Sequence, residues 1–124
     1  MGRMFAKRQG SALTYLGPET EVLGDLKAKG QVRIDGLVRG SVYVEGELEI
    51  GRTGRVEGER IEAGVIQVHG EVKADVYGGR VSLSKTARLT GTVRAQALDV
   101  EAGAVFIGQT LAGETRALEA PKEA

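Results

Sequence analysis

The sequence contains no cysteine and no tryptophan, and only one of its 124 residues is a histidine. Without cysteine the chain cannot form disulfide bonds, zinc–thiolate sites or a thiolate nucleophile. The single histidine, His69, has no second histidine or cysteine with which to complete a metal site. Aromatic residues make up 4% of the chain, so large rings cannot fill the interior as they do in an ordinary globular core.

The sequence also lacks a net charge and a long apolar run. Its 17 basic and 17 acidic residues balance, so no overall field attracts a nucleic acid or a membrane surface. No apolar stretch approaches the roughly 18 residues of a membrane-spanning helix, and the N-terminus has no hydrophobic signal-peptide segment. We therefore expect a cytoplasmic protein.

Glycine, in contrast, is abundant, with 19 residues in 124, about twice the ordinary usage of roughly 7%. Many of these glycines end an apolar-x-Gly element, in which alanine once replaces the glycine. Successive elements are 16, 18, 16, 17 and 17 residues apart, which identifies an internal repeat. The elements begin at Val22, Val38, Val56, Val72, Leu89 and Phe106.

Each repeat has the same internal pattern of apolar residues. Shortly after the first element comes a single apolar position, occupied by Leu26, Val42, Ile61, Val76, Val93 and Leu111. An alternating apolar pair follows, formed by Val32 and Ile34, Leu48 and Ile50, Ile66 and Val68, Val81 and Leu83, and Leu98 and Val100. This period-two alternation predicts three short strands in each repeat, separated by glycine-containing corners.

Strands this short cannot each bury a face alone, but stacked repeats can. We therefore predict an all-β fold, a single-stranded parallel β-helix (β-solenoid) of about six coils of 16–18 residues,. Its corners require glycine because positive φ angles or close contact between coils exclude a Cβ. The predicted organisation is a flexible N-terminal tail (1–14), the β-solenoid (15–112) and a flexible C-terminal tail (113–124).

The two ends of the predicted rod show no polar or helical cap, although an open solenoid end exposes strand edges and core. We predict that these ends meet other copies of the chain. The C-terminal interface residues would be Val105, Phe106, Ile107 and Leu111. The N-terminal interface residues would be Leu13, Tyr15, Leu16, Val22 and Leu23. Phe106 could also serve as a larger plug that fills the last coil, and the two roles are compatible.

The repeat resembles the bactofilin family of bacterial cytoskeletal proteins. The likeness covers residues 16–113, and the run "VRIDGLVRGSVYVEGELEIGRTGRVEG" is similar to the glycine-punctuated aliphatic repeats of that family. The resemblance implies a right-handed β-helix of triangular cross-section that assembles end to end, without nucleotide, into non-polar filaments. It also implies a membrane-associated scaffold for cell shape or envelope machinery, with envelope-synthesis proteins as possible partners.

Bactofilins commonly carry a short apolar and basic membrane-targeting motif in the N-terminal tail. The resemblance places it on Arg3, Met4, Phe5, Lys7 and Arg8, with the alternative that these residues form an ordinary solvated tail. One apolar ring and a few basic residues bind anionic lipid only weakly, but a polymer with many copies would bind by avidity. The implied location is the inner face of the cell membrane, with peripheral attachment.

The sequence favours a structural protein over an enzyme, and we expect no catalytic residue, cofactor, metal, nucleotide or nucleic acid. His69 precedes a glycine at a predicted corner and fits a solvated turn, and no phosphate-binding P-loop occurs. The competing hypothesis is a left-handed β-helix acyltransferase built from hexapeptides, with a catalytic histidine. Its six-residue spacing is followed by Leu26, Val32, Val38, Val44, Ile50 and Val56 but fails at Glu62.

Overall fold

The structure is a computed structural model that describes residues 13–117, and all the regular elements in this range are β-strands. No helix long and apolar enough to cross a membrane is found in residues 13–117. The nine strands of this range are β1 (Leu13–Leu16), β2 (Glu21–Leu23), β3 (Leu26–Ile34), β4 (Leu37–Arg39), β5 (Val42–Ile50), β6 (Arg55–Val68), β7 (Glu71–Leu83), β8 (Arg88–Val100) and β9 (Val105–Ala117).

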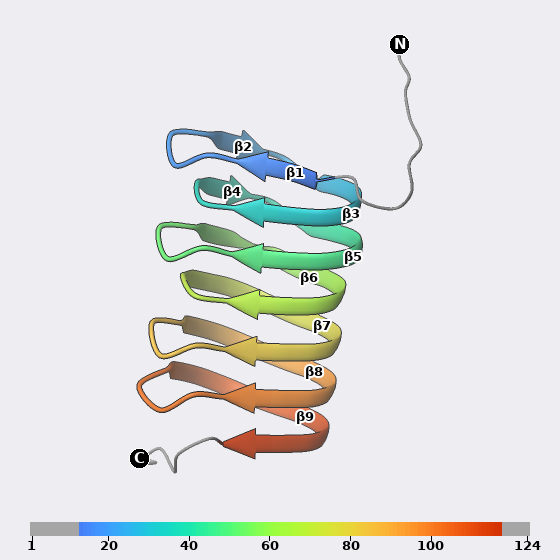
Figure 1. Cartoon of the computed structure of the whole chain (residues 1–124), viewed down its shortest axis with the longest axis vertical. Helices are drawn as coiled ribbons and strands as arrows, with labels where there is room; N and C mark the ends of the chain where they lie inside the picture. The colour runs from blue at the N-terminus through green and yellow to red at the C-terminus, as the bar shows by residue number, and fades with distance from the viewer. Residues whose placement is uncertain (1–12, 118–124) are drawn as a thin grey trace.

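The strands stack in parallel as successive coils of one rod (Figure 1). The hydrogen-bonded order is β1-β3-β5-β6-β7-β8-β9, with β2 paired to β4 and β4 paired to β6. The N-terminal coil lies at one end of the rod, the C-terminal coil lies at the other, and the turns between coils line one side. The predicted parallel β-solenoid of about six coils is confirmed.

Equivalent positions of the repeat predicted from the sequence are the residues that pair between neighbouring coils in the structure. The first residues of the apolar-x-Gly elements pair directly with one another from coil to coil, as Val22, Val38, Val56, Val72, Leu89 and Phe106. Each coil has three paired stretches, which in β6 are residues 55–57, 60–63 and 65–68. We call them the first, second and third stretch of a coil.

One repeat position was assigned to the wrong residue. Val93 of β8 pairs with Thr110, whereas Leu111 pairs with the outward-facing Arg94. Because side chains alternate along a strand, Leu111 points away from the core, and 55% of its surface is exposed,. The sequence pattern selected the nearest apolar residue, but the register of the last coil gives the inward position to threonine.

The core is a column of branched aliphatic side chains along the axis of the rod. Most inward residues of the four middle coils are almost fully buried, and they include Val38, Ile50, Ile61, Val76 and Leu89. Leu26 in the first coil and Phe106 in the last are only partly buried against this core. Burial of such side chains stabilises each by roughly 1.5–3 kcal/mol, so the middle coils contribute most of this stabilisation.

The strands are longer than predicted because hydrogen bonding continues through the glycine corners. Gly30 lies within β3 and pairs with Gly46 within β5, so that two predicted strands become one. Glycine at these corners lets the chain bend while the ladder on both sides remains in register. The strands also extend beyond the predicted solenoid, from Leu13 to Ala117, so residues 113–117 belong to β9.

The number of residues per coil varies along the rod. Paired residues are separated by as few as 15 positions, as for Arg60 and Asp75, and by as many as 19, as for Val42 and Ile61. A hexapeptide solenoid needs a uniform 18. The register therefore does not fit the competing acyltransferase architecture.

Gly91 shows why the corners need glycine, and Gly24 provides a matched control. Both have positive φ angles, 143° and 124° respectively, so alanine at either position costs roughly 1–2 kcal/mol of backbone strain. A Cβ on Gly91 would also collide with the carbonyl oxygen of Ala74 in the preceding coil, whereas a Cβ on Gly24 would meet nothing within 4 Å.

We therefore expect Gly91→Ala to lower the free energy of unfolding by about 1–3 kcal/mol more than Gly24→Ala does. Denaturant unfolding followed by circular dichroism measures both variants. Equal losses of stability in the two variants would contradict close contact between coils as the reason why the corner at Gly91 needs glycine.

Candidate polymer interface

Both ends of the rod leave β-strand edges open. Among the described residues, β1 pairs only with β3, β2 pairs only with β4, and β9 pairs only with β8. The outer backbone groups of these strands can therefore accept another strand, as open sheet edges generally can.

Large exposed apolar side chains are confined to the two end coils. Among residues 13–117, their exposed fractions run from 40% for Val105 to 72% for Leu23. The full set consists of Leu13, Tyr15 and Leu23 at the N-terminal end and Val105, Ile107 and Leu111 at the C-terminal end. Exposed apolar side chains grouped in this way are typical of interaction surfaces.

The predicted end residues fall into two sets in the structure. Leu16, Val22 and Phe106 point inward and pack against the core while remaining partly exposed. The other six point outward beside the open edges; Val105 and Ile107, for example, are in register with the exposed Arg88 and Thr90. The structure thus places all nine predicted residues at the ends, and their role in assembly remains a prediction.

A buried carboxylate at the N-terminal end was not predicted from the sequence. Asp35 follows β3, and 8% of its surface is exposed. Its Oδ2 accepts a hydrogen bond of 2.9 Å from the Tyr15 hydroxyl and one of 3.2 Å from Arg33 Nε. A buried charge needs such partners, and these contacts tie the first strand, β1, to the next coil.

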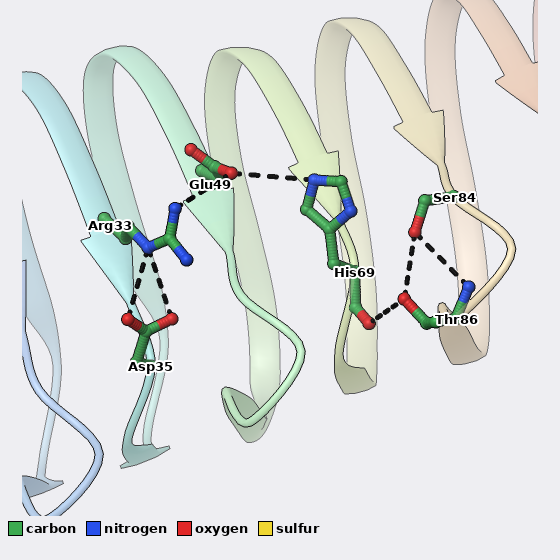
Figure 2. A network of polar contacts seen from close by, with 6 residues as sticks. All are labelled: Arg33, Asp35, Glu49, His69, Ser84 and Thr86. Carbon is green, nitrogen blue, oxygen red and sulfur yellow. Dashed lines mark hydrogen bonds and ion pairs between the residues drawn. The ribbon is translucent and has the colours of Figure 1, made fainter.

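The polar contacts continue from coil to coil along the rod (Figure 2). Arg33 also donates from Nη1 to Glu49 Oε2 at 3.3 Å, and this oxygen lies 3.6 Å from His69 Nε2. The carbonyl oxygen of His69 accepts a 2.7 Å hydrogen bond from the Thr86 hydroxyl. His69 therefore lies at a turn, as predicted, with its side chain beside one carboxylate. Among residues 13–111, whose side chains the structure describes, no group of three or more potential metal ligands comes together.

The Asp35 carboxylate shifts the titration of both of its partners. The hydrogen bond to Asp35, together with desolvation, raises the pKa of Tyr15 above its ordinary value. The hydrogen bond to Asp35 and the negative charges of Asp35 and Glu49 raise the pKa of Arg33. Tyr15 is thus held in its protonated form and Arg33 in its charged form.

The predicted membrane-targeting residues Arg3, Met4, Phe5, Lys7 and Arg8 lie outside the described residues.

The geometry defines a parallel β-solenoid with apolar, open-edged coils at both ends. The model of the Bactofilin family, described as polymer-forming cytoskeletal, matches residues 14–110. The chain belongs to this family.

Solved structures agree with this assignment. The chain is 73% identical to the protein in a cryo-EM reconstruction of Thermus thermophilus bactofilin double helical filaments, with a TM-score of 0.79 and coverage of 81% of this chain and 99% of that one. It is 72% identical to a crystallised mutant of Thermus thermophilus bactofilin, with a TM-score of 0.70 and coverage of 72% and 99%.

A more distant relative is the cytoskeletal bactofilin BacA, whose structure was determined by solid-state NMR. The chain is 31% identical to it, with a TM-score of 0.71 and coverage of 84% of this chain and 97% of that one. A search of curated proteins found no match.

The Tyr15–Asp35 contact predicts a pH dependence. Because the folded-state pKa of Tyr15 is raised, the contact should stabilise the rod fully below the unfolded pKa of roughly 10. This contribution should be lost as the pH rises through the folded pKa of Tyr15.

Absorbance titration of the three tyrosines measures this shift directly. We expect Tyr15→Phe to remove the transition at highest pH, and Asp35→Asn to move that transition towards roughly 10. Tyr43→Phe is the control and should leave the transition in place. An Asp35→Asn titration identical to that of the unmodified chain would contradict the hydrogen bond as the cause.

Proposed function

We propose that this chain is a structural, non-catalytic protein that assembles end to end, without nucleotide, into non-polar filaments. The observation that carries this proposal is that, among the side chains the structure describes, the large exposed apolar ones are confined to the first and last coils. End-to-end contact would cover these side chains and supply partners for the open edges of β1, β2 and β9 at the same time.

Contact between like ends accounts for a filament without polarity. If N-terminal ends meet N-terminal ends and C-terminal ends meet C-terminal ends, each contact uses the same residues of both copies around a two-fold axis. The two ends carry different residues, so each forms its own kind of contact. We further propose that two such linear chains of copies, which we call filament strands, pair side by side, as the Thermus thermophilus relative does in its double helical filaments.

Replacing Phe106 by arginine tests the C-terminal contact. Phe106 is partly exposed on the last coil, so a contact with a second copy would bury the introduced charge without a partner. We expect Phe106→Arg to abolish filaments, as seen by negative-stain electron microscopy, while circular dichroism still shows β structure.

Thr90→Arg provides the control, since Thr90 is exposed in the preceding coil in register with Ile107. This variant should form filaments normally. Ordinary filaments from Phe106→Arg would remove Phe106 from the interface.

We also propose that the filament is attached to the inner face of the cell membrane through Arg3, Met4, Phe5, Lys7 and Arg8. Each basic residue near anionic lipid contributes only about 1 kcal/mol, so a single copy would bind weakly. A filament holds many copies together and makes the later contacts intramolecular. Attached in this way, the filament would act as a scaffold for cell shape or for envelope-synthesis proteins.

Deleting residues 1–8 separates attachment from assembly. We expect the shortened chain to form filaments but to lose co-sedimentation with vesicles that contain anionic lipid, while the full chain pellets with them. Undiminished pelleting of the shortened chain with vesicles would remove this segment as the anchor.

A further inference from the structure

The second stretches of the coils form a lateral surface with a distinctive composition. One column of outward residues in these stretches runs along the rod, and we call it the second-stretch face. It consists of Lys27, Tyr43, Glu62, Tyr77, Arg94 and Leu111. Tyr43 and Tyr77 are the only aromatic residues between Tyr15 and Phe106 in the sequence. All phenylalanine, tyrosine and tryptophan side chains of the middle coils therefore lie on this face.

Each tyrosine of this face lies near at least one cationic side chain. The guanidinium carbon of Arg60 lies 3.9 Å from the centre of the Tyr77 ring, and that of Arg94 lies 5.8 Å from it. Lys27 Nζ lies 5.9 Å from the centre of the Tyr43 ring. Tyrosine and arginine are among the residues most enriched at the energetic centres of protein interfaces.

An extra residue interrupts the ladder beside Tyr77. Three residues separate Glu57 from Ile61 in β6, whereas two separate Arg39 from Val42 and Lys73 from Val76 in the coils on either side. Such bulges re-aim side chains and commonly accompany functional surfaces. Here the bulge places the exposed Glu59 and Arg60 at the corner next to Tyr77.

A hollow at this bulge carries balanced charges. Its lining includes the cations Arg60 and Lys73, the carboxylates of Glu59 and Asp75, and Tyr77. A nucleic acid or an anionic membrane would require one sign of charge. A second copy turned through a two-fold axis would instead bring the cations of each hollow to the carboxylates of the other.

The position of the hollow also fits a contact between filament strands. β6 and β7 lie midway along the rod (Figure 1), so end-to-end assembly leaves them uncovered. We propose that the second-stretch face around Tyr77 is the surface through which two filament strands pair. This inference rests on the proposed function, and it identifies the surface that the lateral pairing would use.

The absence of cysteine allows a direct test with single introduced thiols. Glu59→Cys places a thiol at the proposed contact, and Gln67→Cys places one on the third stretch of the same strand, β6, at a similar distance from the ends. Both positions are exposed. Within one strand of the filament, the middle coils of successive copies are too far apart for a short bis-maleimide to join them.

We expect the bis-maleimide to join assembled Glu59→Cys chains into a species of twice the monomer mass, and to leave Gln67→Cys chains as monomers. Electron microscopy of the same samples reports whether filaments are present. Filaments without a Glu59 cross-link, or with equal cross-linking at both positions, would overturn the lateral surface alone. Absence of filaments from the unmodified chain would overturn the proposed function and this inference together.

Charge reversal gives a second readout with matched variants. Arg60 and Arg39 are both exposed arginines with an intramolecular glutamate partner, Glu62 and Glu57 respectively. We expect Arg60→Glu to give unpaired single filaments and Arg39→Glu to give paired ones. Adding Glu59→Arg to Arg60→Glu should restore pairing, because the hollow again carries both signs. Paired filaments from Arg60→Glu, or loss of pairing in both single variants, would contradict the proposal.

Discussion

The close parallel stacking of successive coils is the constraint on which the rest of the structure depends. The backbone of each coil hydrogen-bonds to the next, and at corners such as Gly108 a Cβ would collide with the carbonyl oxygen of Gly91. Glycine at the corners permits this spacing, and branched aliphatic residues between the corners fill the narrow interior. The shortage of aromatic residues and the abundance of glycine would be unusual in a globular core. Both follow from this close stacking of coils.

The same stacking explains why the ends of the rod differ from its middle. Every middle coil has a neighbour on both sides, whereas the first and last coils have one each among the described residues. Gly24 has open space where the corresponding glycines of later coils meet a carbonyl group. A ladder of this kind does not close on itself, so in the proposed assembly the interaction that stabilises each coil would also join one copy to the next. Asp35, which binds both Tyr15 and Arg33, strengthens the attachment of β1 at one of these ends.

The sequence was sufficient to predict the fold because one inward column, from Val22 to Phe106, keeps its apolar character while the coil length changes. Other features depend on register, which apolar identity alone does not specify. Leu111 was placed in the core, but the register assigns that position to Thr110. Asp35 precedes a glycine as many ordinary turn residues do, and its partner Tyr15 comes from another coil. The bulge at Glu59 also emerges only when neighbouring coils are aligned. The end residues could be located from the sequence, because they lie in the first and last repeats, but their proposed contacts with a second copy do not follow from the pattern of a single chain.

The most direct test of this account is electron microscopy of the purified, unmodified full-length chain over a range of concentrations and salt, with no nucleotide added. End-to-end stacking of open coils predicts filaments whose two directions are indistinguishable. Particles the size of a single rod under every condition would contradict it, because the exposed apolar coils would then have no partner.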